Sequence, residues 1–240
     1  MGQPKLFKLI DKAIFDYHLI APGERILVGA SGGKDSTALI DYLAQRKKRP
    51  SADFSFTALT IATDVSPALH PEIAALFADW QVKHITRHVS VLERIAAGKR
   101  MNCWWCSTQR RTELLDYALQ NGYTAIALGH HLDDILETLL MNMLHKGELS
   151  TMTPLMRYEK YPVKVIRPLC LAPVDLIKAY VTERQYAATT CTCTYQDNSG
   201  RRAARTQLLA LTGGDAVLKA RLFTALHNVK HAYLPSYEKH

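Results

Sequence analysis

The chain of 240 residues has no long apolar run, no recognisable leader and only five cysteines. A membrane helix needs about 20 consecutive apolar residues, and no such run occurs. The N-terminal segment carries charges and has no small-residue cleavage site after an apolar stretch, unlike a signal peptide. An odd number of cysteines argues against a disulfide framework. We therefore expect a soluble, cytoplasmic protein with no membrane partner.

The composition also lacks the bias of disordered or fibrous chains. Hydrophobic residues make up 48% and charged residues 22%, which is typical of a globular protein. Acidic side chains are the scarcer charge, with 22 Asp and Glu against 30 Lys and Arg, a net charge of +8. This balance favours anionic partners such as RNA or nucleotides.

Apolar patterns along the chain alternate between the strand and helix types. Strands are predicted at residues 25–30, 54–62, 84–89, 125–129 and 163–169. Helices are predicted at residues 5–19, 37–45, 71–80, 106–120, 132–145 and 174–185, with a helical tail from about 202 to 233. This alternation predicts an α/β fold whose parallel sheet of about five strands carries helices on both faces, plus a C-terminal helical extension.

The same patterns suggest three parts of the chain. Residues 1–22 form an N-terminal helix, residues 23–186 form the α/β domain, and residues 187–240 form a cysteine segment with the helical tail. Residues 146–162 are predicted as a loop of mixed character. Ligands of parallel sheets lie beyond the carboxyl ends of the strands, where both sharp motifs of this sequence fall.

The first motif is the glycine loop SGGKDS at residues 31–36, between a strand and a helix. Two glycines let backbone N–H groups approach a phosphate closely, and a helix N-terminus favours negative charge. It is not a Walker A loop, because Val28 and Asp35 occupy positions where that motif requires Gly and Ser or Thr. A plain glycine turn before a helix is the alternative.

SGGKDS resembles the fingerprint of the ATP pyrophosphatase (PP-loop) superfamily, whose fold is of the adenine nucleotide alpha hydrolase type. The resemblance implies cleavage of ATP to AMP and pyrophosphate. It implies phosphate-binding and catalytic roles for Ser31, Gly32, Gly33, Lys34, Asp35 and Ser36. Lys34 would neutralise the phosphates, and Asp35 would help to hold Mg²⁺, which prefers oxygen ligands. Asp64, at the end of the second strand, lies where the family contacts adenosine.

The second motif, GHHLDDILET at residues 129–138, also opens a helix at a strand end. Asp134 and Glu137 share a helix face, as do Asp133 and Glu137. Such carboxylates could hold Mg²⁺ or position a substrate, with Gly129 and His130 against the nucleotide and His130 near its α-phosphate. Alternatively, the aspartates favour only the helix dipole and the histidines are solvated.

Four of the five cysteines form two tight pairs, Cys103 with Cys106 and Cys191 with Cys193. Helix N-termini stabilise thiolates, and the first pair immediately precedes a predicted helix. A redox dithiol, a four-ligand zinc site and an iron–sulfur cluster are all compatible with these pairs. Cys170 follows a strand and is expected to be a small buried hydrophobe.

CWWC followed by paired arginines, together with GHHLDDILET, resembles the tRNA 2-thiocytidine synthetases (TtcA) and, more distantly, the tRNA-isoleucine lysidine synthetases. The resemblance implies a [4Fe–4S] cluster on Cys103, Cys106 and a third cysteine. Cys193 is favoured, with Cys191 as the alternative, because Thr190 stands where the family has a cysteine. Residues 1–102 contain no cysteine, unlike families with zinc ribbons flanking the ATP domain.

The family resemblance implies an enzyme that uses ATP and Mg²⁺ to replace the C2 oxygen of a tRNA cytidine, position 32, by sulfur. A cysteine desulfurase or another donor would supply the sulfur, and a homodimer resembles family behaviour. The alternatives are a lysidine-synthetase-like or 2-thiouridine-forming enzyme, and a zinc-stabilised RNA-binding protein with a residual nucleotide site.

Several basic and aromatic residues are candidates for tRNA contact. They are Arg110, Arg111, Arg167 of an RPL segment, Arg201 and Arg205. For each, a solvated or structural role is the alternative, as it is for the basic run at residues 46–49. Trp104 and Trp105 could stack on a base, shield a metal site or fill the core.

Overall fold

The computed structural model describes residues 2–66, 68–96, 98, 100–186 and 199–235. Its six strands form one sheet, in the order β3-β2-β1-β4-β6-β5. They are β1 (Glu24–Gly29), β2 (Phe54–Thr63), β3 (His84–Val89), β4 (Ala125–Ala127), β5 (Leu155–Arg157) and β6 (Lys164–Ile166). Five of them pair in parallel, and β5 pairs antiparallel with β6 at one edge. The predicted α/β fold with five parallel strands is confirmed.

Eight α-helices and one short 3₁₀ helix lie in the described part of the chain. They are α1 (Lys5–Asp16), α2 (Lys34–Lys47), α3 (Pro71–Asp79), α4 (Cys103–Gln120), α5 (Leu132–Lys146), α6 (Val174–Glu183), α7 (Ser199–Thr212), α8 (Ala216–Ala225) and η1 (His231–Tyr233). No helix among the described residues combines the length and the apolar character that crossing a bilayer requires.

Helices cover both faces of the sheet, so its central strands are apolar on both sides. In β1, Ile26 and Val28 join the larger core, to which α1, α2, α3, α5 and α6 contribute. Leu27 points to the other face and packs with Leu114 and Ala118 of α4. This double burial explains why β1 reads as a continuous hydrophobic run.

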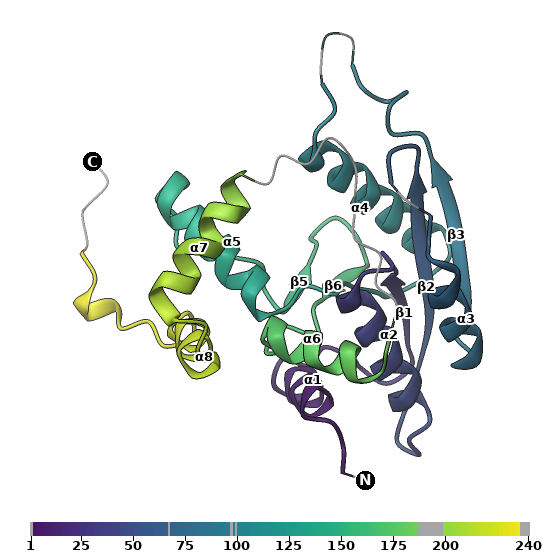
Figure 1. Cartoon of the computed structure of the whole chain (residues 1–240), viewed down its shortest axis with the longest axis horizontal. Coiled ribbons are helices and arrows are strands. Elements are labelled where there is room, and N and C mark those ends of the chain that lie inside the picture. Colours follow the sequence, from purple (N-terminus) through teal and green to yellow (C-terminus); the bar gives the residue numbers. More distant parts are fainter. Residues whose placement is uncertain (1, 67, 97, 99, 187–198, 236–240) are drawn as a thin grey trace.

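Strands β1 and β4 are neighbours in the middle of the sheet, and the chain leaves them toward opposite edges. The loops that follow them, ending at Gly33 and His131, therefore meet at a topological switch point. The N-terminus of α4, which follows β3, opens toward the same end of the sheet (Figure 1). Both sequence motifs and the first cysteine pair thus face one end.

The structure departs from the predicted elements in three places. A short strand, β5, lies inside the predicted loop 146–162, where three partly exposed residues give no periodic signal. Helix α2 begins at Lys34 and takes in half of the glycine loop. Helix α4 begins at Cys103, so both cysteines lie in its first turn.

Helices α5, α7 and α8 pack together on one side of the molecule, far from β3 (Figure 1). Buried charges hold this group: Lys219 of α8 contacts Asp133 of α5 at 2.6 Å, and both residues are 5% exposed. The backbone N–H of Val174 donates to the other Asp133 oxygen at 2.8 Å. One carboxylate therefore ties α5 to both α8 and α6.

Replacing Lys219 by alanine is expected to destabilise the protein by about 3–5 kcal/mol, because it leaves the Asp133 charge buried without its cation. Lys178→Ala is the matched control: Lys178 also pairs with an aspartate, Asp175, at 3.0 Å, but both side chains are exposed. That pair is worth less than about 1 kcal/mol. Urea unfolding of both variants measures the difference, and equal midpoints would contradict the interpretation.

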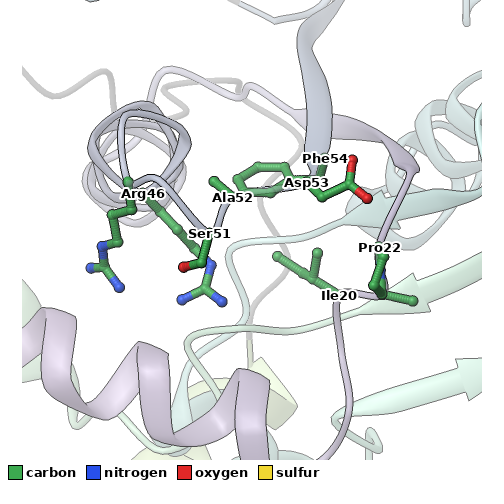
Figure 2. A pocket seen from close by; sticks show the side chains of 9 residues that line it. Ile20, Pro22, Arg46, Ser51, Ala52, Asp53 and Phe54 are labelled. Atoms are coloured by element: carbon green, nitrogen blue, oxygen red, sulfur yellow. The ribbon is translucent and has the colours of Figure 1, made fainter.

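A hollow of about 140 Å³ lies at the opposite end of the sheet, before β1 and β2 (Figure 2). It is lined by Arg46 and Arg49 from the end of α2 and by Asp53. Both arginines bind Asp11 of α1, with Arg49 Nη1 at 2.8 Å from Oδ1. The basic run at residues 46–49 therefore joins α2 to α1, and it lies away from both motifs.

Candidate nucleotide and thiolate site

The glycine loop is braced by its own hydroxyl groups. Gly32 has φ +76°, a left-handed conformation that glycine adopts without strain. Ser31 Oγ lies 3.1 Å from Ser36 Oγ and accepts the N–H of Gly33 at 3.3 Å. Ser36 Oγ donates to the Gly33 carbonyl at 3.0 Å. Gly33 is the N-cap of α2, so no cap side chain shields the first helical N–H groups from an anion.

Lys34 and Asp35 place opposite charges at the start of α2. Lys34 Nζ lies 2.8 Å from Asp35 Oδ2. The second oxygen, Asp35 Oδ1, is buried and accepts no hydrogen bond from the described residues, although His131 Nε2 is 3.9 Å away. A buried carboxylate oxygen without a donor is costly, and a bound cation would remove that cost. Asp35 is therefore suited to serve as a ligand of Mg²⁺.

The loop after β4 lies directly against the loop after β1. A Cβ placed on Gly129 would come within 3.1 Å of the Ser36 backbone nitrogen and 3.2 Å of the Asp35 carbonyl carbon. These distances are tighter than ordinary van der Waals contact, and the opposing atoms are backbone. A side chain at the glycine that opens GHHLDDILET would therefore force one of the two backbone segments to shift by a few tenths of an ångström.

Gly129→Ala is expected to cost about 1–3 kcal/mol of stability, because one backbone segment must move away from the other. It should also weaken ATP binding, since the phosphate loop is the segment displaced. The matched control is Gly200→Ala in α7, where the added methyl meets Met141 at an ordinary 3.7 Å. Thermal unfolding and ATP titration distinguish the two variants. A Gly129→Ala protein as stable as Gly200→Ala would contradict the steric argument.

His131 and Asp134 cap α5 reciprocally. His131 Nδ1 accepts the Asp134 N–H at 3.3 Å, and Asp134 Oδ2 accepts the His131 N–H at 3.2 Å. Asp134 Oδ1 lies 3.3 Å from Arg201 Nη1 of α7. Sequence reasoning missed this capping box, because serine or threonine normally occupies the position that His131 takes here.

The other two carboxylates of the motif point toward the C-terminal helices. Glu137 is buried, and its Oε1 accepts from Arg205 Nε of α7 at 2.8 Å. Asp133 is held by Lys219, as described above. The expectation of a carboxylate cluster that faces the nucleotide therefore fails for Asp133 and Glu137, whose contacts hold the tail helices instead.

His130 and Arg167 bring buried nitrogen atoms to the same region. Burial lowers the pKa of His130 to about 4, and the positive charges of Arg167 and Arg201 act in the same direction, against Asp134. His130 is therefore neutral at pH 7. Arg167 Nη1 donates to the Thr153 carbonyl at 2.6 Å. His130 Nδ1 and Arg167 Nε are buried without a partner among the described residues, which suits them to a ligand oxygen.

The first cysteine pair lies in a capped helix start. Asn102 is the N-cap of α4, and its Oδ1 accepts the Trp105 N–H at 2.8 Å. Cys103 and Cys106 are half-buried in the turn that follows. Asparagine before a helix is a readable start signal that our sequence prediction overlooked, and it accounts for the early beginning of α4.

The second cysteine pair lies outside the described residues, so the third ligand predicted at Cys193 or Cys191 stays a prediction. Within the described ranges, no three His, Cys, Asp or Glu side chains gather as a metal-binding group. Cys170 is buried, as expected, and burial raises the pKa of its thiol to about 12. It is therefore a core residue.

Comparison with known proteins decides the family. The PP-loop domain family matches residues 4–214. A tRNA-cytidine(32) 2-sulfurtransferase from Anaeromyxobacter sp. (strain Fw109-5) is 33% identical over 99% of this chain and 80% of its own. One from Acaryochloris marina is 34% identical over 97% of this chain and 83% of its own. The chain belongs to the tRNA-cytidine(32) 2-sulfurtransferase family.

A solved structure shares the fold of this 2-sulfurtransferase family member. The U34-tRNA thiolase NcsA from Methanococcus maripaludis, determined with its [4Fe–4S] cluster, superposes with a TM-score of 0.75. The match covers 97% of this chain and 82% of that chain at 19% identity. The resemblance found in SGGKDS, CWWC and GHHLDDILET is confirmed, as is the PP-loop fold.

Asp64 has a structural contact in this family member. Its carboxylate accepts hydrogen bonds from Ser90 Oγ and from the backbone N–H groups of Val91 and Leu92, each at 3.0 Å. Burial acts to raise the pKa of Asp64, but these hydrogen bonds lower it overall. Asp64 thus fixes the loop after β3, and its predicted contact with adenosine stays a prediction.

The arginines predicted to contact RNA fall into two groups in this 2-sulfurtransferase. Arg201 and Arg205 pair with the carboxylates of α5, and Arg167 is buried. Arg110 and Arg111 both lie on α4, about one turn after Cys106 and two turns after Cys103, and Arg111 is exposed. Proximity to Arg111 contributes, after burial, to a lowered pKa of Arg167. Sequence reasoning also missed Lys219, which lies in no motif and binds Asp133 of α5.

Proposed function

We propose that this protein is an ATP-dependent tRNA sulfurtransferase that replaces the C2 oxygen of cytidine 32 by sulfur. The supporting observation is the family: relatives of that name are 33–34% identical over nearly the whole chain. The geometry agrees, since a phosphate loop and a pair of cysteines on α4 open at the same end of the sheet. Such an enzyme needs both an activating nucleotide and a sulfur-carrying group.

The first step is the activation of a poor leaving group. The cytidine O2 forms a bond with the α-phosphorus of ATP, and the bond to pyrophosphate breaks. Lys34, Ser31, Ser36 and the N–H groups at the start of α2 bind the phosphates and stabilise the negative charge that moves to pyrophosphate. His130, neutral at pH 7, donates a hydrogen bond to an α-phosphate oxygen.

The second step exchanges oxygen for sulfur. Sulfur at the sulfide level attacks C2, the C2–O bond breaks, AMP leaves and the sulfur proton passes to solvent. The sulfur atom is proposed to come from cysteine through a desulfurase, or from another donor, and a thiol reductant brings it to the sulfide level. The buried guanidinium of Arg167, whose Nε has no partner among the described residues, stabilises the departing AMP by its positive charge.

The carboxylates and thiols of this chain are suited to hold two further groups, Mg²⁺ and an iron–sulfur cluster. Asp35, with its unpartnered oxygen, is proposed to hold Mg²⁺ together with Asp134, and Mg²⁺ neutralises phosphate charge. Cys103, Cys106 and Cys193, or Cys191 in its place, are proposed to hold the [4Fe–4S] cluster. Three thiolates leave one iron open, and when bound the cluster supplies that iron as a sulfur-binding position.

The alternatives differ in what they require of these residues. A lysidine-synthetase-like enzyme has no use for the cysteine pair, and a zinc-stabilised RNA-binding protein has no use for Lys34 and Asp35. The predicted tRNA contacts of five arginines stay predictions: Arg110, Arg111, Arg167, Arg201 and Arg205. The identity of the sulfur donor, a homodimer and the cytoplasmic location also stay predictions.

Nucleoside mass spectrometry of tRNA from a strain lacking this protein tests the proposal. The expected result is the loss of 2-thiocytidine, restored by the wild-type gene. Loss of 2-thiouridine or lysidine instead would establish one of the other PP-loop activities. Iron and sulfide analysis of protein purified without oxygen separates the cluster from zinc. Unchanged nucleosides together with stoichiometric zinc would overturn the proposal.

A further inference from the structure

The three tryptophans of the chain differ sharply in exposure. Trp80 packs against Phe77 and Tyr186, with ring centroids 6.1 and 5.4 Å away. Trp105 is partly buried, and its indole N–H points to the Val91 carbonyl at 3.4 Å. Trp104 is 70% exposed. Tryptophan is a highly buried residue on average, so an indole left in solvent between Cys103 and Cys106 is unusual.

The turn of α4 that carries Trp104 is held by several hydrogen bonds. It lies in the first turn, between Cys103 and Cys106, and its carbonyl accepts hydrogen bonds from Ser107 Oγ at 3.0 Å and Thr108 Oγ1 at 2.8 Å. The Asn102 cap fixes the same turn from the other side. The backbone that carries the indole is therefore held in place, although the ring itself faces solvent.

A cation shares the exposed face of α4 with this ring. Trp104, Thr108 and Arg111 are spaced by four and three residues, which places them on one side of a helix. The Arg111 guanidinium is anchored to its own helix, with Nε 3.2 Å from the Ser107 carbonyl and Nη2 3.2 Å from Thr108 Oγ1. In single-stranded RNA each base is followed by a phosphate. A flat aromatic ring can stack on the base, and an arginine fixed beside the ring can bind the phosphate.

We propose that Trp104 stacks on a base of the tRNA loop that enters the site, while Arg111 contacts the adjoining phosphate. This inference rests on the proposed function and adds a binding residue to it. Trp105 is excluded from the role because its ring is partly buried and its N–H faces a carbonyl. A ring that shielded the cysteines or filled the core would be buried rather than 70% exposed.

The first test measures the affinity of the anaerobically purified full-length protein for an RNA anticodon stem–loop. Trp104→Ala is expected to bind about 5- to 100-fold more weakly, as loss of one stacked base predicts. Trp104→Phe keeps a flat ring and should stay close to wild type. The matched control is Phe15→Ala, because Phe15 is 77% exposed but lies on α1, away from the site. Its affinity should not change.

The second test identifies the stacked base with stem–loops that each lack one loop base. The penalty of Trp104→Ala should disappear for one of these RNAs and persist for the others. Equal affinities of Trp104→Ala and wild type, or the same penalty on every RNA, would overturn the proposal. So would a loss of bound iron in Trp104→Ala with RNA affinity unchanged, which would indicate shielding.

These outcomes separate the inference from the proposed function. If wild-type protein neither binds the stem–loop nor thiolates tRNA, the proposed function fails. If wild type does both and Trp104→Ala equals it, only the stacking role fails. Circular dichroism should show equal unfolding temperatures, because an exposed ring contributes little to the core.

Discussion

Cys106→Ala is expected to reduce tRNA thiolation to the level measured without enzyme, and Cys103→Ala should do the same. Both thiols lie in the first turn of α4, and each is a proposed ligand of the cluster that carries sulfur. ATP binding should be retained, because the phosphate loop lies on a different element, α2. Nucleoside mass spectrometry measures thiolation, and equilibrium titration measures ATP binding.

Cys170→Ala is the matched control for both cysteine variants. Cys170→Ala also removes one thiol group, but Cys170 is fully buried in the core, and its raised thiol pKa keeps it protonated. We expect a small loss of stability and normal thiolation. If Cys106→Ala still thiolates tRNA at the wild-type rate, these thiols do not carry the sulfur, and the mechanism above is wrong.

Asp35→Ala is expected to slow ATP consumption by more than about 100-fold. The substitution removes the buried oxygen that fits Mg²⁺ and leaves Lys34 without its partner at 2.8 Å. Loss of an outer-shell contact at a metal site already costs about 10–100-fold, so the loss of a direct ligand should exceed it. Release of pyrophosphate in the presence of tRNA measures the effect.

Asp175→Ala provides a control of the same local type. Asp175 is also the second residue of a helix, α6, and also pairs with a lysine, Lys178. Its carboxylate is exposed and lies outside the phosphate loop. Unchanged turnover is expected there. If Asp35→Ala and Asp175→Ala both retain normal ATP consumption, Asp35 is not part of the metal site.

Sequence patterns predicted the parallel strands and both motifs because these depend on local order. A buried strand such as β1 and the glycine loop at its end can each be recognised from a run of consecutive residues. Helix α4 began earlier than predicted because the Asn102 cap outweighed the poor helical pattern of the cysteine turn. The strand β5 escaped prediction because three residues carry no period.

The roles of the α5 carboxylates depended on distant partners. Asp133 and Lys219 are separated by 86 positions, and Glu137 and Arg205 by 68. No spacing rule connects such pairs, so the acidic motif looked available for a ligand. Of the three carboxylates, only Asp134 lies near the phosphate loop, because His131 lies close to both Asp134 and Asp35. The Asp134 carboxylate also caps α5.

Gly129 packs directly against the first turn of α2, and this contact constrains which substitutions such enzymes can accept as they diverge. Two segments far apart in the gene meet backbone to backbone, with no side chain between them to absorb a change. A substitution that displaces either segment must be matched by the other. The two motifs should therefore be inherited as a single unit, and chimaeras that join them from different relatives should fold worse than either parent.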